Sequence, residues 1–153
     1  MFLTVGILLA ATAIDANGSL FPLTHAVVDA ENDDNWLWFL RLLLPIVQSH
    51  ALQNLIDKAL VLLSDRQKGL LEAVERVFPG CPHGYCLKHL KANFHKKFKK
   101  SKLTPFLWKA ANATTQPEFD KAFADMANIN SNAVPWLLEH TKSEHWVELY
   151  FPG

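Results

Sequence analysis

The amino-acid sequence predicts an α/β fold, in which a mixed sheet with flanking helices runs into a helical appendage. Two apolar runs, 5–14 and 20–28, are joined by a short polar segment with an Asn-Gly pair, which is typical of an antiparallel hairpin. A third apolar run, 59–63, has the length of a buried strand and is followed by a helical pattern. Beyond Gly80 we expect one short strand and then only helices.

Capping residues and helix breakers mark the helix ends in the first half of the chain. The polar cluster 31–35 supplies caps and acids for a helix that we expect to end near Leu44, because Pro45 would interrupt it. A second amphipathic helix, 70–77, is expected to stop at the Phe-Pro-Gly sequence of residues 78–80. The strand-to-helix unit therefore places a polar tip directly after the third apolar run.

Similar signals predict the helices of the appendage. Thr104 with Pro105 is typical of a helix start, and Thr115 with Glu118 predicts a capping box for the next helix. Two apolar stripes follow, and the tryptophans are expected to be core anchors because most sit at apolar helical spacings. The stripes are Phe119, Phe123, Met126 and Ile129, then Val134, Leu137 and Leu138, and the tryptophans are Trp36, Trp38, Trp108, Trp136 and Trp146.

Composition indicates a globular protein rather than a disordered tail or a membrane bundle. The 153 residues are 50% hydrophobic and carry 15 basic and 15 acidic side chains, and no apolar run approaches the roughly 20 residues of a membrane helix. Only Cys81 and Cys86 are present, which favours a reducing, cytosolic or nuclear compartment. Secretion is disfavoured, because the apolar run 2–13 has no Lys or Arg before it.

One stretch of the chain is strongly basic. No Asp or Glu occurs between Glu75 and Glu118, and Phe94 and Phe98 alternate there with lysines. This pattern predicts an apolar stripe beneath a cationic helix face that contacts DNA phosphates, and the alternative is a solvated face that keeps the protein soluble. The candidate nucleic-acid contacts are Lys88, Lys91, Lys96, Lys97, Lys99 and Lys100.

Two further positions could carry chemistry. Asp65 follows a buried strand, so its carboxylate would be rigidly held and open to a hard cation such as Mg²⁺, although an acid in this position is more often the N-cap of the following helix. Cys86 and His89 lie three residues apart and offer two zinc ligands. Since a zinc site needs four, the sequence favours packing or a local hydrogen bond for this pair.

A series of ordered motifs covers nearly the whole chain and resembles the catalytic core of Mutator-like element (MULE) transposases. The motifs are 14–23 (IDANGSLFPL), 26–40 (AVVDAENDDNWLWFL), 64–70 (SDRQKGL), 78–79 (FP), 86–90 (CLKHL), 108–115 (WKAANATT), 133–137 (AVPWL) and 145–151 (HWVELYF). The resemblance implies an incomplete RNase H-like core over residues 1–92 and a helical insertion over 93–153, similar to retroviral integrases.

The same resemblance implies a chemistry. In the family, two Asp and one Glu hold two Mg²⁺ or Mn²⁺ ions for DNA strand cleavage and transfer, and Asp65 matches the second acid. The first Asp is expected on a strand just before the hairpin, and the Glu in an Asn-x-x-Glu-Ser motif just beyond 146–151. We therefore expect a nuclear transposase fragment that is inactive alone, and the alternative is a domesticated, non-catalytic module that binds nucleic acid or protein.

The absent first strand also has a structural implication. In an RNase H-like sheet it is the central strand, between the hairpin and the strand that ends at Asp65. Its loss would leave two unpaired inner edges, which predicts a strand-completing partner or a homo-oligomer.

Overall fold

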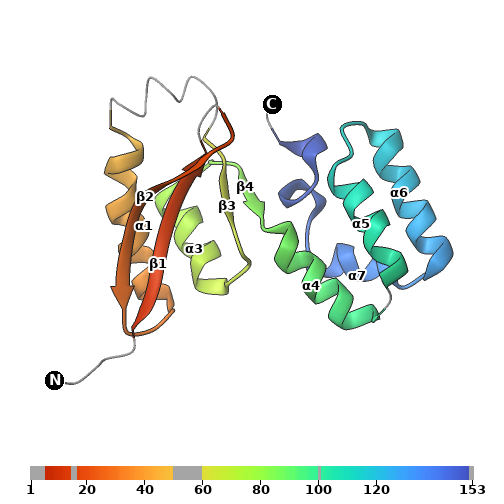
Figure 1. The fold of residues 1–153 in the computed structure, drawn as a ribbon, viewed down its shortest axis with the longest axis horizontal. Coiled ribbons are helices and arrows are strands. Elements are labelled where there is room, and N and C mark those ends of the chain that lie inside the picture. Colours follow the sequence, from red (N-terminus) through yellow and green to blue (C-terminus); the bar gives the residue numbers. More distant parts are fainter. Residues whose placement is uncertain (1–5, 15–16, 50–59, 100, 152–153) are drawn as a thin grey trace. The chain divides into compact units, whose positions relative to one another are not determined.

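The computed structural model describes residues 6–14, 17–49, 60–99 and 101–151 (Figure 1). The elements in chain order are β1 (Ile7–Ile14), β2 (Leu20–Val28), α1 (Asp33–Val47), β3 (Leu62–Ser64), α3 (Lys68–Val77), β4 (His83–Tyr85), α4 (Leu87–Phe98), α5 (Thr104–Ala111), α6 (Gln116–Ile129) and α7 (Ala133–His140), with 3-10 turns at Ser101–Leu103, Ser143–His145 and Glu148–Tyr150.

The chain divides into two compact units. One comprises Met1–Leu60 with Gln67–Cys81, and the other comprises Val61–Arg66 with Pro82–Gly153. Among the described elements, the first unit contains β1, β2, α1 and α3, and the second contains β3, β4 and α4 to α7. The assignment of 1–92 and 93–153 to two domains stays a prediction.

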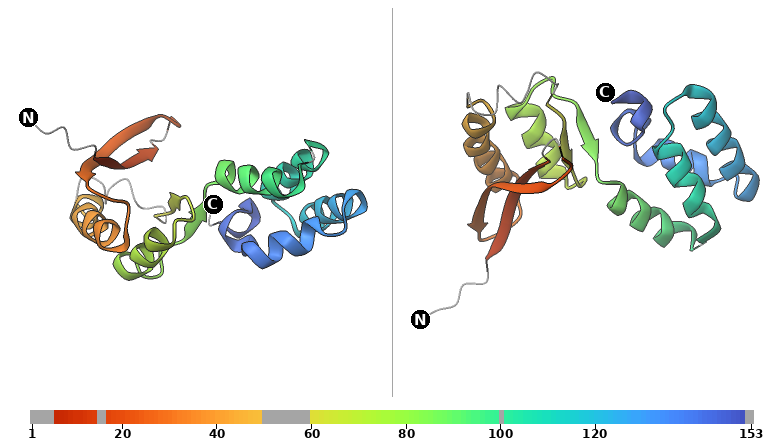
Figure 2. Two further views of the ribbon diagram at one scale, coloured as in Figure 1. Left: turned by 90° about the horizontal axis from the view of Figure 1, so that it is seen from below. Right: turned by 45° about the horizontal axis from the view of Figure 1, so that its top comes forward.

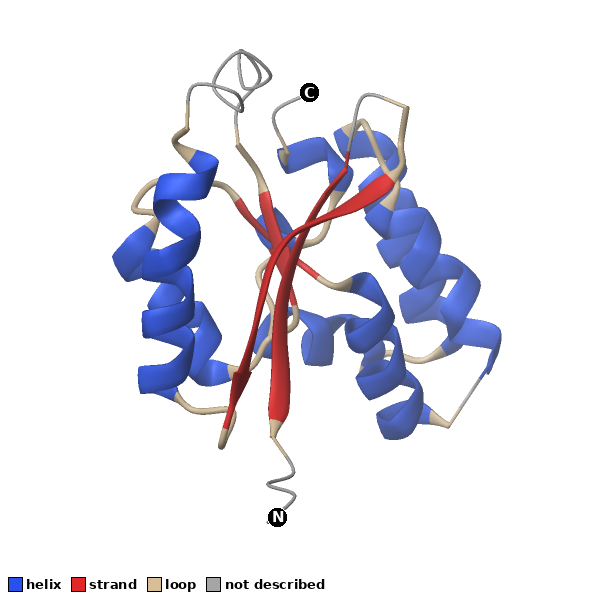
Figure 3. Cartoon of the chain, turned by 60° about the vertical axis from the view of Figure 1, so that its left-hand side comes forward, coloured by secondary structure: helices blue, strands red, loops and turns tan. Residues whose placement is uncertain are grey.

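The α/β class is confirmed. Figure 3 shows the described strands and helices, and the strands form two small sheets, an antiparallel β1–β2 pair and a parallel β3–β4 pair. An RNase H-like arrangement of these elements stays a prediction. Within the part of the chain that the structure describes, every helix is too short or too polar to cross a membrane.

The predicted hairpin is confirmed. β1 and β2 pair in register from Ile7 opposite Val28 to Ile14 opposite Leu20, with a register shift between Ala11 and Thr12. Gly18 in the connection has φ of 77°, a left-handed backbone that glycine adopts without steric cost. The strand residues alternate between a face that packs on α1 and a face whose apolar side chains are exposed.

Helix α1 begins as predicted but ends later. Asn32 is its N-cap, and the Asn32 Oδ1 atom accepts a hydrogen bond of 2.9 Å from the Asn35 amide. The expected end near Leu44 is wrong, because the helix continues through Pro45 to Val47. Pro45 is exposed and lies in the last turn, so only one intrahelical hydrogen bond is missing where the helix is already ending.

Helix α3 ends at the predicted breaker, with Phe78 as its C-cap, but it begins two residues earlier than expected, after the N-cap Gln67. The Gln67 Oε1 atom accepts from the Leu70 amide at 2.7 Å. In the first turn, a Cβ atom at Gly69 would overlap the Asp33 carboxylate and lie 3.0 Å from the Asp33 Cα atom. The close packing of α3 against α1 therefore requires glycine at position 69.

The second unit has its own hydrophobic core. Leu90, Phe94, Leu107, Met126 and Leu137 are each at most 1% exposed, and they come from the four helices α4 to α7. Figure 2 shows this helical group in two further views. The predicted stripes of α6 and α7 are confirmed apart from the last member of each, which is exposed. The exposed members are Ile129 and Leu138, at 37% and 56%.

Local helix starts in this unit depart slightly from the predictions. Thr104 is the first residue of α5 rather than its cap, and Pro105 lies in the first turn as predicted. Thr115 is the N-cap of α6, but its side chain makes no capping hydrogen bond. Instead the Glu118 Oε2 atom accepts from the Thr114 amide at 3.1 Å, which also lowers the pKa of the Glu118 carboxyl.

Candidate functional site

The parallel pairing of β3 with β4 brings two predicted site residues to the same end of a sheet. Ser64 lies opposite Tyr85, and the Cys86 amide donates to the Ser64 carbonyl at 2.6 Å. Asp65 and Cys86, which follow these residues, therefore lie at the carboxyl ends of adjacent strands. Cys86 is also the N-cap of α4, so the basic helix begins where Asp65 lies.

Asp65 is half-buried in the turn that follows β3. The Ser64 hydroxyl donates to the backbone carbonyl of Asp65 at 2.7 Å and so fixes the turn. The interpretation of Asp65 as the cap of the following helix is wrong, because Gln67 is that cap. A second anchor is Arg66, whose Nη1 atom donates to the His140 carbonyl at the end of α7.

A cluster of side chains that the sequence did not predict surrounds the same strand ends. Since the Ser64 hydroxyl is already a donor, the 2.8 Å bond between Ser64 Oγ and His83 Nε2 has the imidazole as donor. His145 Nδ1 lies 2.8 Å from the His83 carbonyl, which only accepts, so Nδ1 carries a proton. The hydrogen-bond network thus assigns a tautomer to each histidine.

The pKa values of this cluster respond to its burial. Burial lowers the pKa of His83, and electrostatic repulsion from His145 lowers it further. Burial likewise raises the pKa of Tyr85, with an opposing effect from Arg66 and a reinforcing one from Glu144. The Tyr85 ring stacks on the His145 ring with centroids 4.4 Å apart. Burial therefore favours the neutral form of the His83 imidazole, and the N–H groups assigned to His83 and His145 are already used inside the cluster.

No sequence signal links these residues, because His83 and His145 are 62 positions apart. Their meeting depends on the three-residue strand β4 and on the 3-10 turn Ser143–His145, which are elements too short for a periodicity to reveal.

Helix α4 confirms the predicted apolar stripe, since Phe94 is buried and Phe98 packs against the core while partly buried. Leu90 and Phe94 are 0% and 1% exposed, while the described lysines of the basic stretch all face solvent. The exposed members are Lys88, Lys91, Lys96, Lys97 and Lys99, and Lys100 lies outside the described residues.

These cations do not share one face. A helix turns by about 100° per residue, so Lys88 and Lys91 lie with His95 along one edge of α4, whereas Lys97 lies on the other side of the exposed surface. The chain then turns away at Lys99, the C-cap, whose φ is 50°. Cations in the last turn also complement the partial negative charge at that end of the helix.

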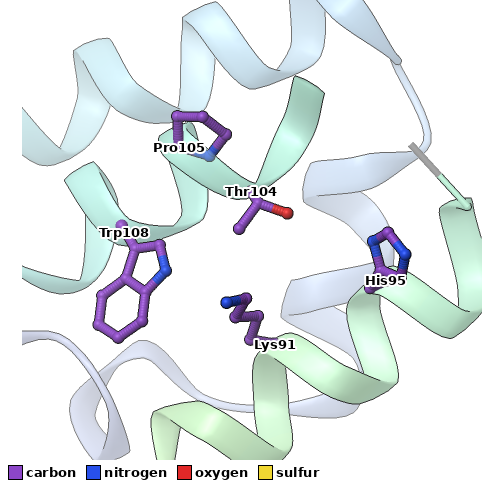
Figure 4. A pocket seen from close by; sticks show the side chains of 5 residues that line it. All are labelled: Lys91, His95, Thr104, Pro105 and Trp108. Carbon is purple, nitrogen blue, oxygen red and sulfur yellow. The ribbon is translucent and has the colours of Figure 1, made fainter. Parts of the chain in front are cut away.

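The edge with Lys91 borders an open hollow of about 510 Å³ between α4 and α5 (Figure 4). It is lined by Lys91 and His95 from α4 and by Thr104, Pro105 and Trp108 from α5. Trp108 is 40% exposed, so its prediction as a core anchor is wrong. The buried side of α5 is formed instead by smaller side chains, Leu107, Ala110 and Ala111.

The positions predicted for metals do not form a complete site among the described residues. No group of three or more His, Cys, Asp and Glu side chains that could hold a metal ion occurs there. Cys86 is half-buried and makes no side-chain capping bond, and His89 is exposed in the first turn of α4. Because Asp65 thus supplies a single carboxylate, no catalytic step through a metal follows from this geometry. Zinc at the Cys86–His89 pair stays a prediction.

Comparison with known families relates part of the chain to a described domain. A family model described as the MULE transposase domain matches residues 3–93. The matched segment includes both sheets, Asp65 and the first turns of α4, whereas α5 to α7 lie outside it. No curated protein matches the chain.

Proposed function

Since the chain belongs to the MULE transposase family, we propose that it acts on nuclear DNA as part of a transposase core. The parent chemistry is metal-dependent cleavage and transfer of DNA strands by an RNase H-like domain. In this proposal the described chain supplies one acid of the metal site and a basic DNA-contacting helix.

The observation that supports this proposal best is the common end of β3 and β4. Asp65 follows one strand and α4 begins directly after the other, held by the 2.6 Å bond between Cys86 N and Ser64 O. A phosphate at the first turn of α4 would meet the positive end of the helix dipole and the exposed Lys88. The same phosphate would lie near the Asp65 carboxylate, where a hard cation bound to oxygen ligands would neutralise its charge.

We propose Mg²⁺ or Mn²⁺ as that cation, with Asp65 as one of its ligands. Carboxylate oxygen suits either ion, and when bound the ion would stabilise negative charge on a reacting phosphate. One carboxylate cannot hold two hard cations against their hydration, so the remaining acids must come from beyond the described residues. We therefore expect that the chain alone does not cleave DNA.

A second candidate function is a non-catalytic nucleic-acid module. The exposed lysines of α4 rest on a fully buried stripe, Leu90 and Phe94, within a unit that has its own core. This basic surface depends on no metal ligand, so it would bind phosphates even where the metal site does not function.

A plasmid-nicking assay combined with DNA binding tests both candidates. We expect the full chain to bind plasmid DNA without nicking it in Mg²⁺ or Mn²⁺. A longer protein that adds an upstream strand with an Asp and a downstream segment with a Glu should nick, and Asp65→Asn should abolish this with little loss of fold, because it removes charge but keeps shape.

Three outcomes would count against the proposals. Nicking that survives Asp65→Asn would place the active site elsewhere. A longer protein that binds DNA but never nicks would favour the non-catalytic module. Absence of DNA binding by the full chain would remove both candidates.

A further inference from the structure

We propose that the hollow between α4 and α5 holds an unpaired base of single-stranded DNA, stacked on Trp108, with the adjoining phosphates on Lys91 and Lys88. The inference rests on the proposed DNA-binding function and adds that the chain prefers single-stranded DNA to a duplex. The α5 side of the hollow lies outside the segment 3–93 that the family model matches.

Trp108 is placed as a platform rather than as part of the core. Leu107, Ala110 and Ala111 already bury the inner side of α5, and Trp108 is 40% exposed at the rim of the hollow. Figure 4 shows the indole ring of Trp108 and the side chain of Lys91 on the two sides of this hollow. An exposed indole beside a concave surface offers a large flat face, to which any base can stack whatever its sequence.

The cations beside the ring fit a nucleic acid better than an uncharged aromatic ligand. Lys91 Nζ lies 5.9 Å from the centre of the Trp108 ring, near the outer limit of about 6 Å for a cation–π contact. Because the Lys91 side chain is exposed, its ammonium can leave the ring for a phosphate at small cost. Lys88 and His95 continue the same edge of α4, one turn to either side.

No acidic side chain is among the residues that line the hollow. The sequence contains no Asp or Glu between Glu75 and Glu118, and both walls of the hollow fall within this stretch. The basic side chains at the hollow therefore suit a polyanion better than a neutral or cationic peptide.

The geometry favours an unpaired base over a duplex. In a duplex the faces of the bases are covered by their neighbours, and only their edges are open in the grooves. A base can lie flat on an indole only when it is unstacked from its own strand. The hollow, of about 510 Å³, is large enough for such a base, and the sugar and phosphates would remain on the lysine edge.

Fluorescence anisotropy with the full chain tests the inference, using labelled oligothymidylate and a duplex of equal length at the same salt concentration. Trp108→Ala should weaken binding of the single strand by about 5- to 150-fold, the effect of removing one base–aromatic stack. Duplex binding and its salt dependence should remain unchanged. Trp108→Phe should restore most of the single-strand affinity, because the phenyl ring keeps a stacking face.

Trp38→Ala is a matched control, because Trp38 is 45% exposed, lies on α1 and is not among the residues that line this hollow. It should leave both affinities unchanged. Equal reductions for single strand and duplex, or no reduction for the single strand, would overturn the inference while leaving the proposed DNA binding intact. If the unmodified chain binds neither DNA, the proposed function itself fails.

Discussion

The guanidinium of Arg66 donates a hydrogen bond of 2.8 Å from Nη1 to the backbone carbonyl of His140. His140 is the last residue of α7, where carbonyl groups have no partner within the helix. The residue after Asp65 is therefore tied to a helix end 74 positions later in the chain. Asp65 and the helical group consequently belong to the same compact unit.

Arg66→Gln should lower the free energy of unfolding by about 1 kcal/mol, because it removes a hydrogen bond from a charged donor to a helix end. Urea denaturation followed by circular dichroism measures the change. Arg76→Gln is the matched control, since Arg76 is exposed on α3 and should tolerate the same substitution. Equal effects of the two substitutions would show that the bond to His140 contributes nothing specific.

His83 should make stability depend on pH near neutrality. The pKa of His83 in the folded chain is lowered by burial and by His145, whereas the unfolded chain titrates at the ordinary value of 6.5. Below that pH the unfolded chain binds more protons, so the free energy of unfolding should fall as pH decreases through about 6.5 toward the folded pKa. Urea midpoints at about pH 7.5 and about pH 5 measure this change.

His83→Gln should flatten this dependence, because an amide can still donate to Ser64 Oγ but does not titrate. His25→Gln, at an exposed position of β2, should leave the dependence as it is. A His83→Gln chain with the original slope would mean that another group causes it.

Gly69→Ala should destabilise the chain, although alanine is the better helix former by about 1 kcal/mol. The new Cβ atom would overlap the Asp33 carboxylate, and overpacking of this kind costs about 1 to 3 kcal/mol. Asp33→Ala in the same chain should restore part of the stability, so a double-mutant cycle in urea should give a coupling energy. A Gly69→Ala chain more stable than the original would contradict the close approach of α1 and α3.

The edge of α4 that carries Lys88 and Lys91 should contribute to DNA binding. Replacing Lys88 and Lys91 together by Gln should reduce the slope of log affinity against log salt by about 0.9 for each phosphate that these lysines neutralise. Lys121→Gln, on the exposed side of α6, should leave the slope unchanged. Filter binding over a salt series measures all three proteins, and a flat response of the original chain would exclude binding to phosphates altogether.

The sequence predicts local structure here better than it predicts the site. The C-terminal end of α3 follows from the 78–80 breaker next to it, so this boundary can be recognised without tertiary information, whereas the sequence did not predict Gln67 as the N-cap. Pro45 does not end α1 as the sequence predicts. It is exposed and lies in the last turn, where a proline costs the helix little stability.

The surroundings of Asp65 could not be predicted in this way. His83 and Arg66 acquire their roles from partners 62 and 74 residues away in the chain, His145 and His140. The exposure of Trp108 also depends on tertiary packing. Trp108 and Leu107 are neighbours on α5, and which of the two is buried depends on the side of α5 that packs against other helices. Only the motif around Asp65 predicts a role for this residue, and its role in catalysis stays a prediction.

The exposed apolar face of the hairpin should affect how long the chain survives in a cell. Leu8, Leu20 and Val27 are 62%, 70% and 70% exposed there, on strands that are apolar on both faces. Exposed apolar strands are the features by which misfolded chains aggregate and are recognised by chaperones and proteases. A chain whose hairpin keeps this face exposed should therefore be degraded faster than one in which the face is covered.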